Sequence, residues 1–212
     1  MTTKVGLVTG AGGLIGSYIA KTAAALAPSW TIHGLTRRDL DLTDPQALRR
    51  TFRRLRPQLV IHCAALSKPL ACQHEPALAR KVNVEATALL AELAADLPFI
   101  FFSSDLVFDG RAGHYDESAP VNPLNLYAET KAAAERLVLA NPRHVVLRVG
   151  LNGGVSPTGD RGFNEEMQRA WQEGRTLSLF TDEFRNPIPA VATAQAVWEL
   201  VKQGRSGLYH LC

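Results

Sequence analysis

Short apolar runs of the strand type alternate with segments of helical periodicity along most of this 212-residue chain. The runs are rich in β-branched and aromatic residues, and each is followed by enough sequence to form a helix. They lie at residues 5–9, 31–35, 59–63, 99–103 and 145–149. This alternation predicts an α/β fold in which a doubly wound, Rossmann-type parallel sheet carries helices on both faces.

The pattern changes after Gly150, where a loop-rich stretch begins. Helical periodicity returns at residues 164–172 and 190–202, and a short strand is expected between them at residues 176–180. The second part of the chain should therefore face the substrate as an appendage of the sheet rather than fold independently.

We accordingly expect residues 1–150 to form the Rossmann domain and residues 151–212 to form a small, partial substrate-binding annex. The chain closes with a strand-like run at residues 208–212 that has no polar tail behind it. Because this is an unusual place for a natural terminus, we expect the protein to continue beyond Cys212.

Composition narrows the class of protein. Hydrophobic residues make up 46% of the chain, which allows a substantial core, and no apolar run approaches the ~20 residues of a membrane span. The N-terminus enters the first strand without a signal-peptide pattern. Cys63, Cys72 and Cys212 lack the spacing of a disulfide framework, which fits a reducing compartment. We therefore expect a soluble, cytoplasmic protein without a membrane partner.

The charge pattern does not indicate a nucleic-acid partner. The net charge is only +3, and the arginines crowded at residues 49–56 alternate with apolar residues at helical spacing. This is typical of the solvated side of an amphipathic helix, and no interleaved aromatic residues accompany it. His62, Cys63, Cys72 and His74 lack the spacing of zinc ligands, so no metal is expected.

A glycine-rich turn, Gly10-Ala-Gly-Gly13-Leu-Ile-Gly16, joins the first strand to the first predicted helix. Without Cβ atoms the backbone can turn tightly, admit a pyrophosphate and pack the helix on the strand, while N–H groups at the helix start face the phosphates. The order of strand, glycines and helix is the context that gives such a motif meaning. It predicts a dinucleotide-binding site.

The end of the second strand distinguishes the two nicotinamide cofactors. A carboxylate there binds the adenosine ribose hydroxyls, whereas an arginine accepts a 2′-phosphate. The strand runs into Thr-Arg37-Arg, with no acidic residue before Asp39. Because a forked guanidinium suits a phosphate dianion, we expect NADPH, with NADH as the alternative. Asp41 and Leu42 follow and are candidates for contact with the adenine.

Tyr127 and Lys131 belong to the pentad Tyr127-Ala-Glu-Thr-Lys131, whose spacing places both side chains on one face of a helix. A phenol titrates near pH ~10, and an ammonium that lowers its pKa makes it a usable proton donor. The alternative interpretation is an exposed i,i+4 contact on a helix surface, which has the same spacing but no function. Ser104 and Asp105 directly follow the strand at residues 99–103, and a serine hydroxyl at this edge of the sheet can bond a carbonyl oxygen.

Further motifs extend over nearly the whole chain. They are Val60-Ile-His-Cys-Ala-Ala65, Ser103-Ser-Asp-Leu-Val-Phe-Asp-Gly110, Leu40-Asp-Leu-Thr-Asp44, Glu75-Pro-Ala-Leu-Ala79 before Val82-Asn83, Phe184-Arg-Asn-Pro-Ile188 and the closing Gly207-Leu-Tyr-His210. Together with the glycine turn and the pentad, these motifs resemble the extended short-chain dehydrogenase/reductases. Within that superfamily they are most similar to the dTDP-4-dehydrorhamnose reductase family.

The resemblance implies NADPH-dependent reduction of a nucleotide-linked 4-keto-6-deoxy sugar at C4. It makes Tyr127 the proton donor, Ser104 the residue that binds the carbonyl oxygen, and Lys131 the residue that lowers the tyrosine pKa and binds the nicotinamide ribose. Asp105 and Ser104 fall on substrate-contacting positions. A nucleotide sugar is the expected partner, and a homodimer is compatible with the resemblance. With Tyr127 and Lys131, the full expected cofactor set is Gly10, Gly13, Leu14, Ile15, Gly16, Arg37, Asp41, Leu42, Cys63, Ala64 and Ala65.

Two positions depart from the family pattern. A tyrosine usually follows the Ser/Thr-Asp pair, where this chain has Leu106, and an aromatic residue usually follows the fifth strand, where it has Leu151. The family also continues beyond the Tyr-His strand into helices that help to close the substrate cleft. The particular sugar therefore stays open. So do two other functions on this scaffold: a sugar-nucleotide epimerase or dehydratase, and a non-catalytic NADP-binding regulatory subunit.

Overall fold

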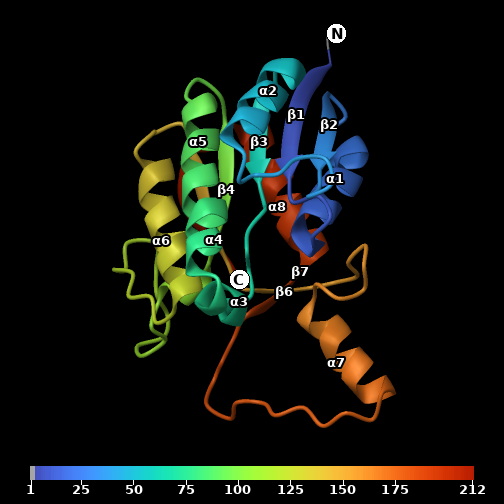
Figure 1. The fold of residues 1–212 in the computed structure, drawn as a ribbon, viewed down its shortest axis with the longest axis vertical. Helices are drawn as coiled ribbons and strands as arrows, with labels where there is room; N and C mark the ends of the chain where they lie inside the picture. Colours follow the sequence, from blue (N-terminus) through green and yellow to red (C-terminus); the bar gives the residue numbers. More distant parts are fainter. Residues whose placement is uncertain (1–2) are drawn as a thin grey trace.

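Six parallel strands form the main sheet of the computed structural model, which describes residues 3–212 (Figure 1). Their order across the sheet is β2-β1-β3-β4-β5-β8, and every neighbouring pair is parallel. The predicted α/β fold with a doubly wound parallel sheet is thereby confirmed. The bounds are β1 Lys4–Thr9, β2 Trp30–Leu35, β3 Leu59–His62, β4 Phe99–Ser104, β5 Val145–Val149 and β8 Gly207–Leu211.

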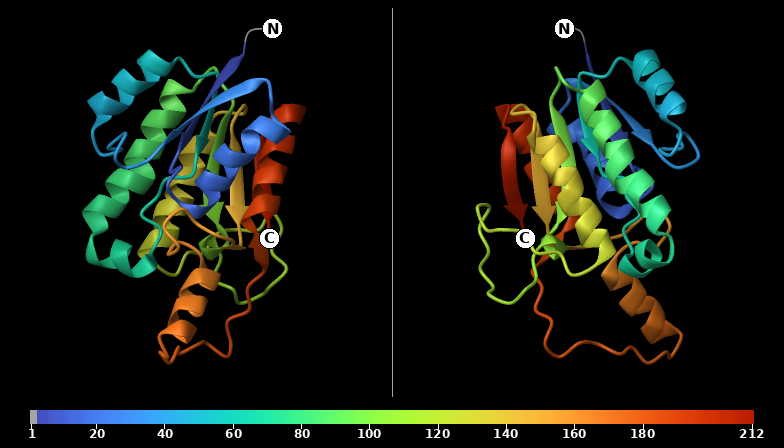
Figure 2. Two further views of the ribbon diagram at one scale, coloured as in Figure 1. Left: turned by 90° about the vertical axis from the view of Figure 1, so that its right-hand side faces the viewer. Right: turned by 60° about the vertical axis from the view of Figure 1, so that its left-hand side comes forward.

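Helices cover both faces of this sheet (Figure 2). On one face, α1 (Leu14–Leu26) and α8 (Ala190–Gln203) pack Ile19 and Trp198 against Val8 of β1. On the other, α2 (Pro45–Leu55), α5 (Ala86–Leu93) and α6 (Leu126–Leu139) enclose a second apolar core that includes Leu7. Successive residues of a strand point to opposite faces, so adjacent positions of β1 serve both cores. None of the helices in the described residues combines the length and hydropathy that crossing a bilayer requires.

The winding of the chain reverses at β1. This strand pairs with β2 on one side and with β3 on the other, so the chain passes from β1 to β2 on one side and then crosses back over β1 to β3 on the other. In open sheets of this kind, ligands bind beside the carboxyl ends of the strands at that reversal. The glycine turn after β1 and the segment of residues 63–65 after β3 both begin there.

Most predicted elements are confirmed. The five strands appear with ends shifted by at most one residue, and the late helices are α7 (Phe163–Gln172) and α8. The strand predicted at residues 176–180 is wrong: this segment is a loop that pairs with no strand of residues 3–212. Its apolar residues lack a neighbouring strand against which to pair, and all but Leu177 are exposed.

Three short elements connect β3 to α5, and one follows β4. They are α3 (Pro69–His74), α4 (Pro76–Arg80), the single π-helical turn η1 (Lys81–Glu85), and the 3₁₀ turn η2 (Asp105–Val107). A proline at the first helical position starts both α3 and α4, where its missing N–H costs no hydrogen bond. These elements surround the carboxyl edge of the sheet from the α6 side.

A small annex lies at the carboxyl edge of the sheet (Figure 1). It contains α7 and a two-stranded parallel ribbon of β6 (Leu151–Gly153) and β7 (Pro187–Pro189). The segment 173–186, here named the strap, leads from α7 back to β7, passing below the sheet in Figure 1. Residues 190–211 then return to the main sheet as α8 and β8, although the sequence grouped them with the annex.

Candidate active site

The glycine turn packs tightly against the segment that follows β3. Gly10 has a φ of 74°, and a Cβ atom on it would lie 2.7 Å from the backbone nitrogen of Ala64. A Cβ atom on Gly16 would lie 2.4 Å from the Gly10 carbonyl oxygen. Both positions therefore need glycine. Gly13 caps α1 without a side-chain hydrogen bond, and the first turn of α1 holds no acidic residue, so its N–H groups are open to an anion.

The end of β2 lies beside this turn. The Ala11 N–H donates to the Leu35 carbonyl at 3.1 Å. The Asp39 carboxylate accepts hydrogen bonds from the hydroxyl and N–H of Thr36, at 2.7 and 2.8 Å, and these bonds lower its pKa. The only acid near the strand end is thus held within its own turn, while Arg37 is exposed.

Two other predicted cofactor residues, Asp41 and Leu42, lie further along the same loop. Asp41 accepts from the N–H and hydroxyl of Thr43, both at 2.8 Å, and its pKa is lowered by these bonds. Leu42 packs against the apolar core on the α2 side. The Asp41 carboxylate is therefore bonded within its own loop. A ligand would contact the exposed face of this loop.

A buried polar chain joins the ends of β1 and β3. The Thr87 hydroxyl donates to the Asn83 carbonyl at 2.8 Å, so it accepts from His62 Nε2 at 3.0 Å. His62 Nδ1 then accepts from the Thr9 hydroxyl at 2.6 Å. Burial, with a smaller contribution from Lys131, lowers the pKa of His62 to about 3, so the imidazole is neutral. His62 is a structural link rather than a metal ligand.

Ser104, Tyr127 and Lys131 come together at the carboxyl edge. Ser104 ends β4, and α6 starts just after Asn125, whose side-chain oxygen accepts from the Ala128 N–H at 2.9 Å. This cap fixes the start of α6 so that the tyrosine and the lysine, one turn apart, both face inward. All three predicted catalytic side chains are buried, with 7%, 9% and 3% of their surface exposed.

The environment of Tyr127 differs from the prediction. Burial raises its pKa to about 12, because a phenolate is costly away from water. The Ser104 hydroxyl and Arg185 act in the lowering direction, and Asp105 acts in the raising direction. Lys131 was expected to lower this pKa; instead its ammonium lies over the ring of Phe101, 4.2 Å from the centroid. The expectation of a depressed tyrosine pKa is therefore wrong for this structure.

A buried ion pair stands beside Lys131. Burial lowers the pKa of Lys131 to about 8, and the charge of Glu135, one turn further along α6, acts to raise it. Glu135 is held by Arg148 of β5 through a forked contact, with Nη2 to Oε2 at 2.8 Å and Nε to Oε1 at 3.1 Å. The lysine therefore stays largely charged near neutral pH. The sequence analysis missed both partners, although the i,i+4 spacing of Lys131 and Glu135 was a signal for one of them.

Asn83, in the π-helical turn, links the segment after β3 to the catalytic helix. Its Oδ1 accepts from the Leu66 N–H at 2.8 Å, and its Nδ2 donates to the Leu66 carbonyl at 3.1 Å and the Thr130 hydroxyl at 3.0 Å. The Thr130 hydroxyl donates to the Tyr127 carbonyl at 2.7 Å. The sequence showed Asn83 as a family trait but gave it no role, because its partners lie 17 and 47 residues away.

Cysteines and apolar residues line the site from α3. Cys72 is buried against Tyr127, and Leu106, which replaces the usual family tyrosine, packs on the same cluster. Burial raises the pKa of the Cys63 thiol, which lies in the predicted cofactor segment with Ala64 and Ala65. All three thiols of the chain are free. This wall of the site is apolar and uncharged.

Asp105 is held by an arginine that the sequence analysis did not single out. Arg185, in the strap, donates from Nη2 to Asp105 Oδ1 at 2.9 Å and from Nε to Oδ2 at 3.0 Å. The Ser104 hydroxyl donates to the same carboxylate at 3.1 Å. The predicted substrate residue Asp105 thus lies between the Ser104 hydroxyl and a guanidinium from the annex.

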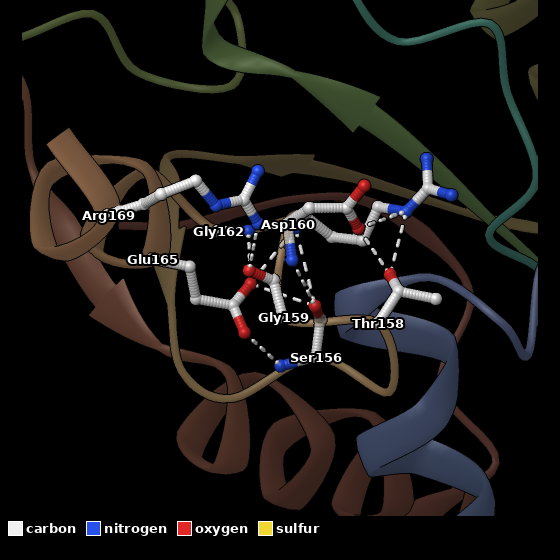
Figure 3. Close-up of polar contacts among 8 residues, drawn as sticks. Ser156, Thr158, Gly159, Asp160, Gly162, Glu165 and Arg169 are labelled. Carbon is white, nitrogen blue, oxygen red and sulfur yellow. Dashed lines mark hydrogen bonds and ion pairs between the residues drawn. The ribbon is translucent and has the colours of Figure 1, made fainter. Parts of the chain in front are cut away.

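Glu165 of α7 organises the loop of residues 154–162 (Figure 3). Its carboxylate accepts from the N–H and hydroxyl of Ser156, at 2.7 and 2.8 Å, and from the N–H groups of Arg161 and Gly162, at 2.9 and 2.8 Å. Burial opposes the charged form, but these bonds outweigh it and lower the pKa to about 2. The loop reaches α1, where the Val155 N–H donates to the Tyr18 hydroxyl at 3.1 Å.

Two half-open surface hollows lie elsewhere. One of about 350 Å³ is lined by Lys4, Trp30 and Trp198, and one of about 290 Å³ by Pro98, Val145 and Ser206. Both lie where strands of the sheet begin, at the edge opposite Ser104. The functional assignment therefore rests on side-chain geometry at the carboxyl edge, not on cavity size.

Comparison with known proteins agrees with this geometry. Residues 4–212 match the family model described as "RmlD substrate binding domain". The chain belongs to this family. A probable low-salt glycan biosynthesis reductase of Haloferax volcanii is 33% identical over 218 residues, which cover 96% of this chain and 73% of the relative. A dTDP-4-keto-6-deoxy-D-glucose reductase of Streptomyces niveus is 31% identical over 210 residues, covering 96% of this chain and 71% of the relative.

Relatives of a second kind share the family. Methionine adenosyltransferase 2 subunit beta of Danio rerio is 31% identical over 216 residues, covering 96% of this chain and 67% of the relative. Among solved structures, a dTDP-4-dehydrorhamnose reductase from Clostridium acetobutylicum superposes with a TM-score of 0.88 at 28% identity, covering 97% of this chain and 73% of that one. Reductases and a subunit named for another enzyme thus resemble the same chain.

Proposed function

We propose that this chain is an NADPH-dependent reductase of a nucleotide-linked 4-keto-6-deoxy sugar. The observation that carries the proposal is the buried assembly of Ser104, Tyr127 and Lys131 beside a glycine turn whose helix N-terminus is open to an anion. The names of the reductase relatives support the substrate class, since two of them act on dTDP-linked keto or dehydro sugars. Leu106 and Leu151 leave the identity of the sugar open.

The residues present fit a nicotinamide dinucleotide. The close approach of Gly16 to Gly10 leaves backbone rather than side chains at the place of a pyrophosphate, and the uncapped start of α1 supplies N–H donors. Arg37 is exposed just after β2, from where an arginine can accept a 2′-phosphate, while the Asp39 carboxylate is bonded to Thr36. Residues 63–65, which pack against Gly10, would form the side of the cofactor site that faces the glycine turn. When bound, NADPH supplies the hydride that reduces the carbonyl carbon.

The chain's own groups handle the proton. With a pKa near 12, Tyr127 is fully protonated at neutral pH and can donate to the oxygen of the reduced carbonyl, since an alcohol is a still weaker acid than a phenol. Ser104 binds that oxygen through its hydroxyl. Lys131, kept charged with the help of Glu135 and placed over the Phe101 ring, is left to bind the nicotinamide ribose.

A regulatory subunit is the second candidate. The similarity to methionine adenosyltransferase 2 subunit beta favours it, because that protein is named as a subunit rather than as a reductase. Such a role would use the cofactor site without turnover. The complete Ser104, Tyr127 and Lys131 set argues for the reductase, since a purely regulatory chain has no need of a buried proton donor.

The decisive experiment measures NADPH oxidation with a panel of dTDP- and UDP-linked 4-keto sugars. We expect turnover by the wild type, and a loss of about 10²-fold or more in Tyr127→Phe with NADPH binding retained. Tyr209→Phe is the matched control, because its hydroxyl bonds the Ser206 carbonyl outside the site.

Three results would change the proposal. Tight NADPH binding without reduction of any sugar favours the regulatory subunit. Sugar conversion without net NADPH consumption indicates an epimerase or dehydratase. Full activity of Tyr127→Phe removes the assigned proton donor.

We also propose that the protein works in the cytoplasm. Its three cysteines are free thiols, which fits a reducing compartment. Homodimer formation stays a prediction, which light scattering on the purified chain tests directly.

A further inference from the structure

The strap contacts the carboxyl edge of the sheet, where Ser104 and Asp105 lie, through Arg185. Of residues 173–186, only Leu177 and Arg185 are not exposed. The strap ends where β7 pairs with β6, and there the Asn186 carbonyl passes so close to Gly150 that a Cβ atom on that glycine would lie 2.5 Å from it. The ribbon therefore fixes the position of Arg185, although most of the strap is free of contacts with the sheet.

Arg185 shares the carboxylate of Asp105 with the Ser104 hydroxyl. Two of its N–H groups bond Asp105 at 2.9 and 3.0 Å, and Nη1 bonds Glu183 at 2.9 Å. The Ser104 hydroxyl donates its hydrogen to the same carboxylate, with Oγ 3.1 Å from Asp105 Oδ1. A carboxylate that is satisfied by a forked guanidinium holds this hydrogen less strongly, so a carbonyl oxygen of the substrate can take it over.

We propose that Arg185 is a positioning residue of the reductase: by neutralising Asp105 it releases the Ser104 hydroxyl to the substrate carbonyl and balances the charge beside Tyr127. This inference rests on the proposed function and adds a residue from the annex to its machinery. The contact between Arg185 and Asp105, here named the latch, also gives the strap a role, because it brings Arg185 to the site and so completes it.

The surroundings of Tyr127 support this role. Beside its phenol lie Ser104, Asp105, Cys72 of α3 and Arg185, and Lys131 is one turn further along the same helix. Asp105 acts to raise the tyrosine pKa and Arg185 acts to lower it. Removing the Arg185 charge therefore shifts the pKa of Tyr127 in the opposite direction from removing the Asp105 charge.

The experiment compares Arg185→Gln, Asp105→Asn and the double variant in sugar reduction at neutral pH. We expect Arg185→Gln to lower kcat by about tenfold, the scale of one lost charge-assisted bond, with a smaller change in KM, because the unneutralised Asp105 carboxylate then keeps the Ser104 hydroxyl. The double variant should recover most of this kcat, because it lacks the charge that holds the hydroxyl. Arg185→Lys, which keeps the charge but not the fork, should be intermediate.

Arg175→Gln is the matched control, since Arg175 pairs with Glu166 and Glu173 at the other end of the strap. A merely structural latch would show no recovery in the double variant, which lacks both charged partners. Wild-type kcat in Arg185→Gln, or no recovery of kcat in the double variant, would overturn the proposal.

A second measurement is independent of turnover. Chymotrypsin should cleave after the exposed Phe180 and Phe184 several-fold faster in Arg185→Gln and in Asp105→Asn than in the wild type, because either change opens the latch. If the wild type reduces no sugar, the proposed function fails while this assay still decides whether the latch exists. Equal cleavage rates in all variants would show that it does not.

Discussion

Replacing Glu165 by glutamine should destabilise the protein by an amount that depends on pH. The carboxylate receives four hydrogen bonds from Ser156, Arg161 and Gly162, and only 7% of the residue is exposed. A glutamine side chain keeps one acceptor oxygen but turns an NH₂ group toward the remaining donors. At least one backbone N–H would then lose its partner, and the repulsion of facing donors would open the loop of residues 154–162.

The magnitude follows from the pKa. Glu165 falls from an ordinary value of 4.5 to about 2 in the folded chain, and each pH unit is ~1.4 kcal/mol, so the charged form contributes about 3 kcal/mol at pH 7. Because the folded pKa is depressed, this contribution is complete above the unfolded value and is lost as pH falls through the folded one. At pH 3, about 1.4 kcal/mol of it should remain.

Urea unfolding followed by circular dichroism, at pH 7 and at pH 3, measures both values. The difference in unfolding free energy between wild type and Glu165→Gln should shrink by about half between the two pH values. The other carboxylates titrate equally in the wild type and in Glu165→Gln, so their contributions cancel in this difference of unfolding free energies. Glu166→Gln is the control: its exposed pair with Arg175 at 3.0 Å should be worth less than ~1 kcal/mol. A difference that is the same at both pH values would refute the assignment of the stability to the Glu165 charge.

Three further predictions concern the cofactor and the buried charges. Gly16→Ala puts a Cβ atom 2.4 Å from the Gly10 carbonyl and should weaken NADPH binding by tenfold or more in a fluorescence titration, and unchanged binding would contradict the role given to the tight turn. Arg37→Ala should weaken NADPH by about tenfold or more but leave NADH unchanged, and equal losses would remove the 2′-phosphate assignment. Arg148→Met strands the buried Glu135 carboxylate and should cost about 3–5 kcal/mol in urea unfolding, while Arg148→Met with Glu135→Gln should recover most of this; no recovery would contradict the ion-pair argument.

The sequence predicted the elements that depend on local periodicity. Five strands were placed to within a residue of their ends, because strand-type runs bounded by turn residues are local signals; β3, β4 and β5 are buried along their whole length. The start of α2 has a similarly local cause, since Asp44 accepts from two N–H groups only three residues away at most. The strand expected at residues 176–180 failed because a strand needs a partner, which no local pattern reveals.

The site shows the same contrast: its local features were predicted from the sequence, and its long-range contacts were not. The glycine turn and the four-residue spacing of Tyr127 and Lys131 are local signals, and they placed the predicted catalytic side chains together. What acts on those side chains was not visible. Lys131 was expected beside the phenol, but its ammonium lies over Phe101, a residue 30 positions earlier in the chain.

The sequence alone therefore determined the fold class and the position of the glycine turn, and it pointed to the three side chains that we propose as catalytic. Only the tertiary structure decided which groups surround these three side chains: Asn83 bonds Thr130 across 47 residues, and Arg185 bonds Asp105 across 80. The physical reason is that backbone periodicity fixes which face of an element is buried, whereas hydrogen bonds and ion pairs between distant segments exist only after the sheet has brought their carboxyl ends to one edge.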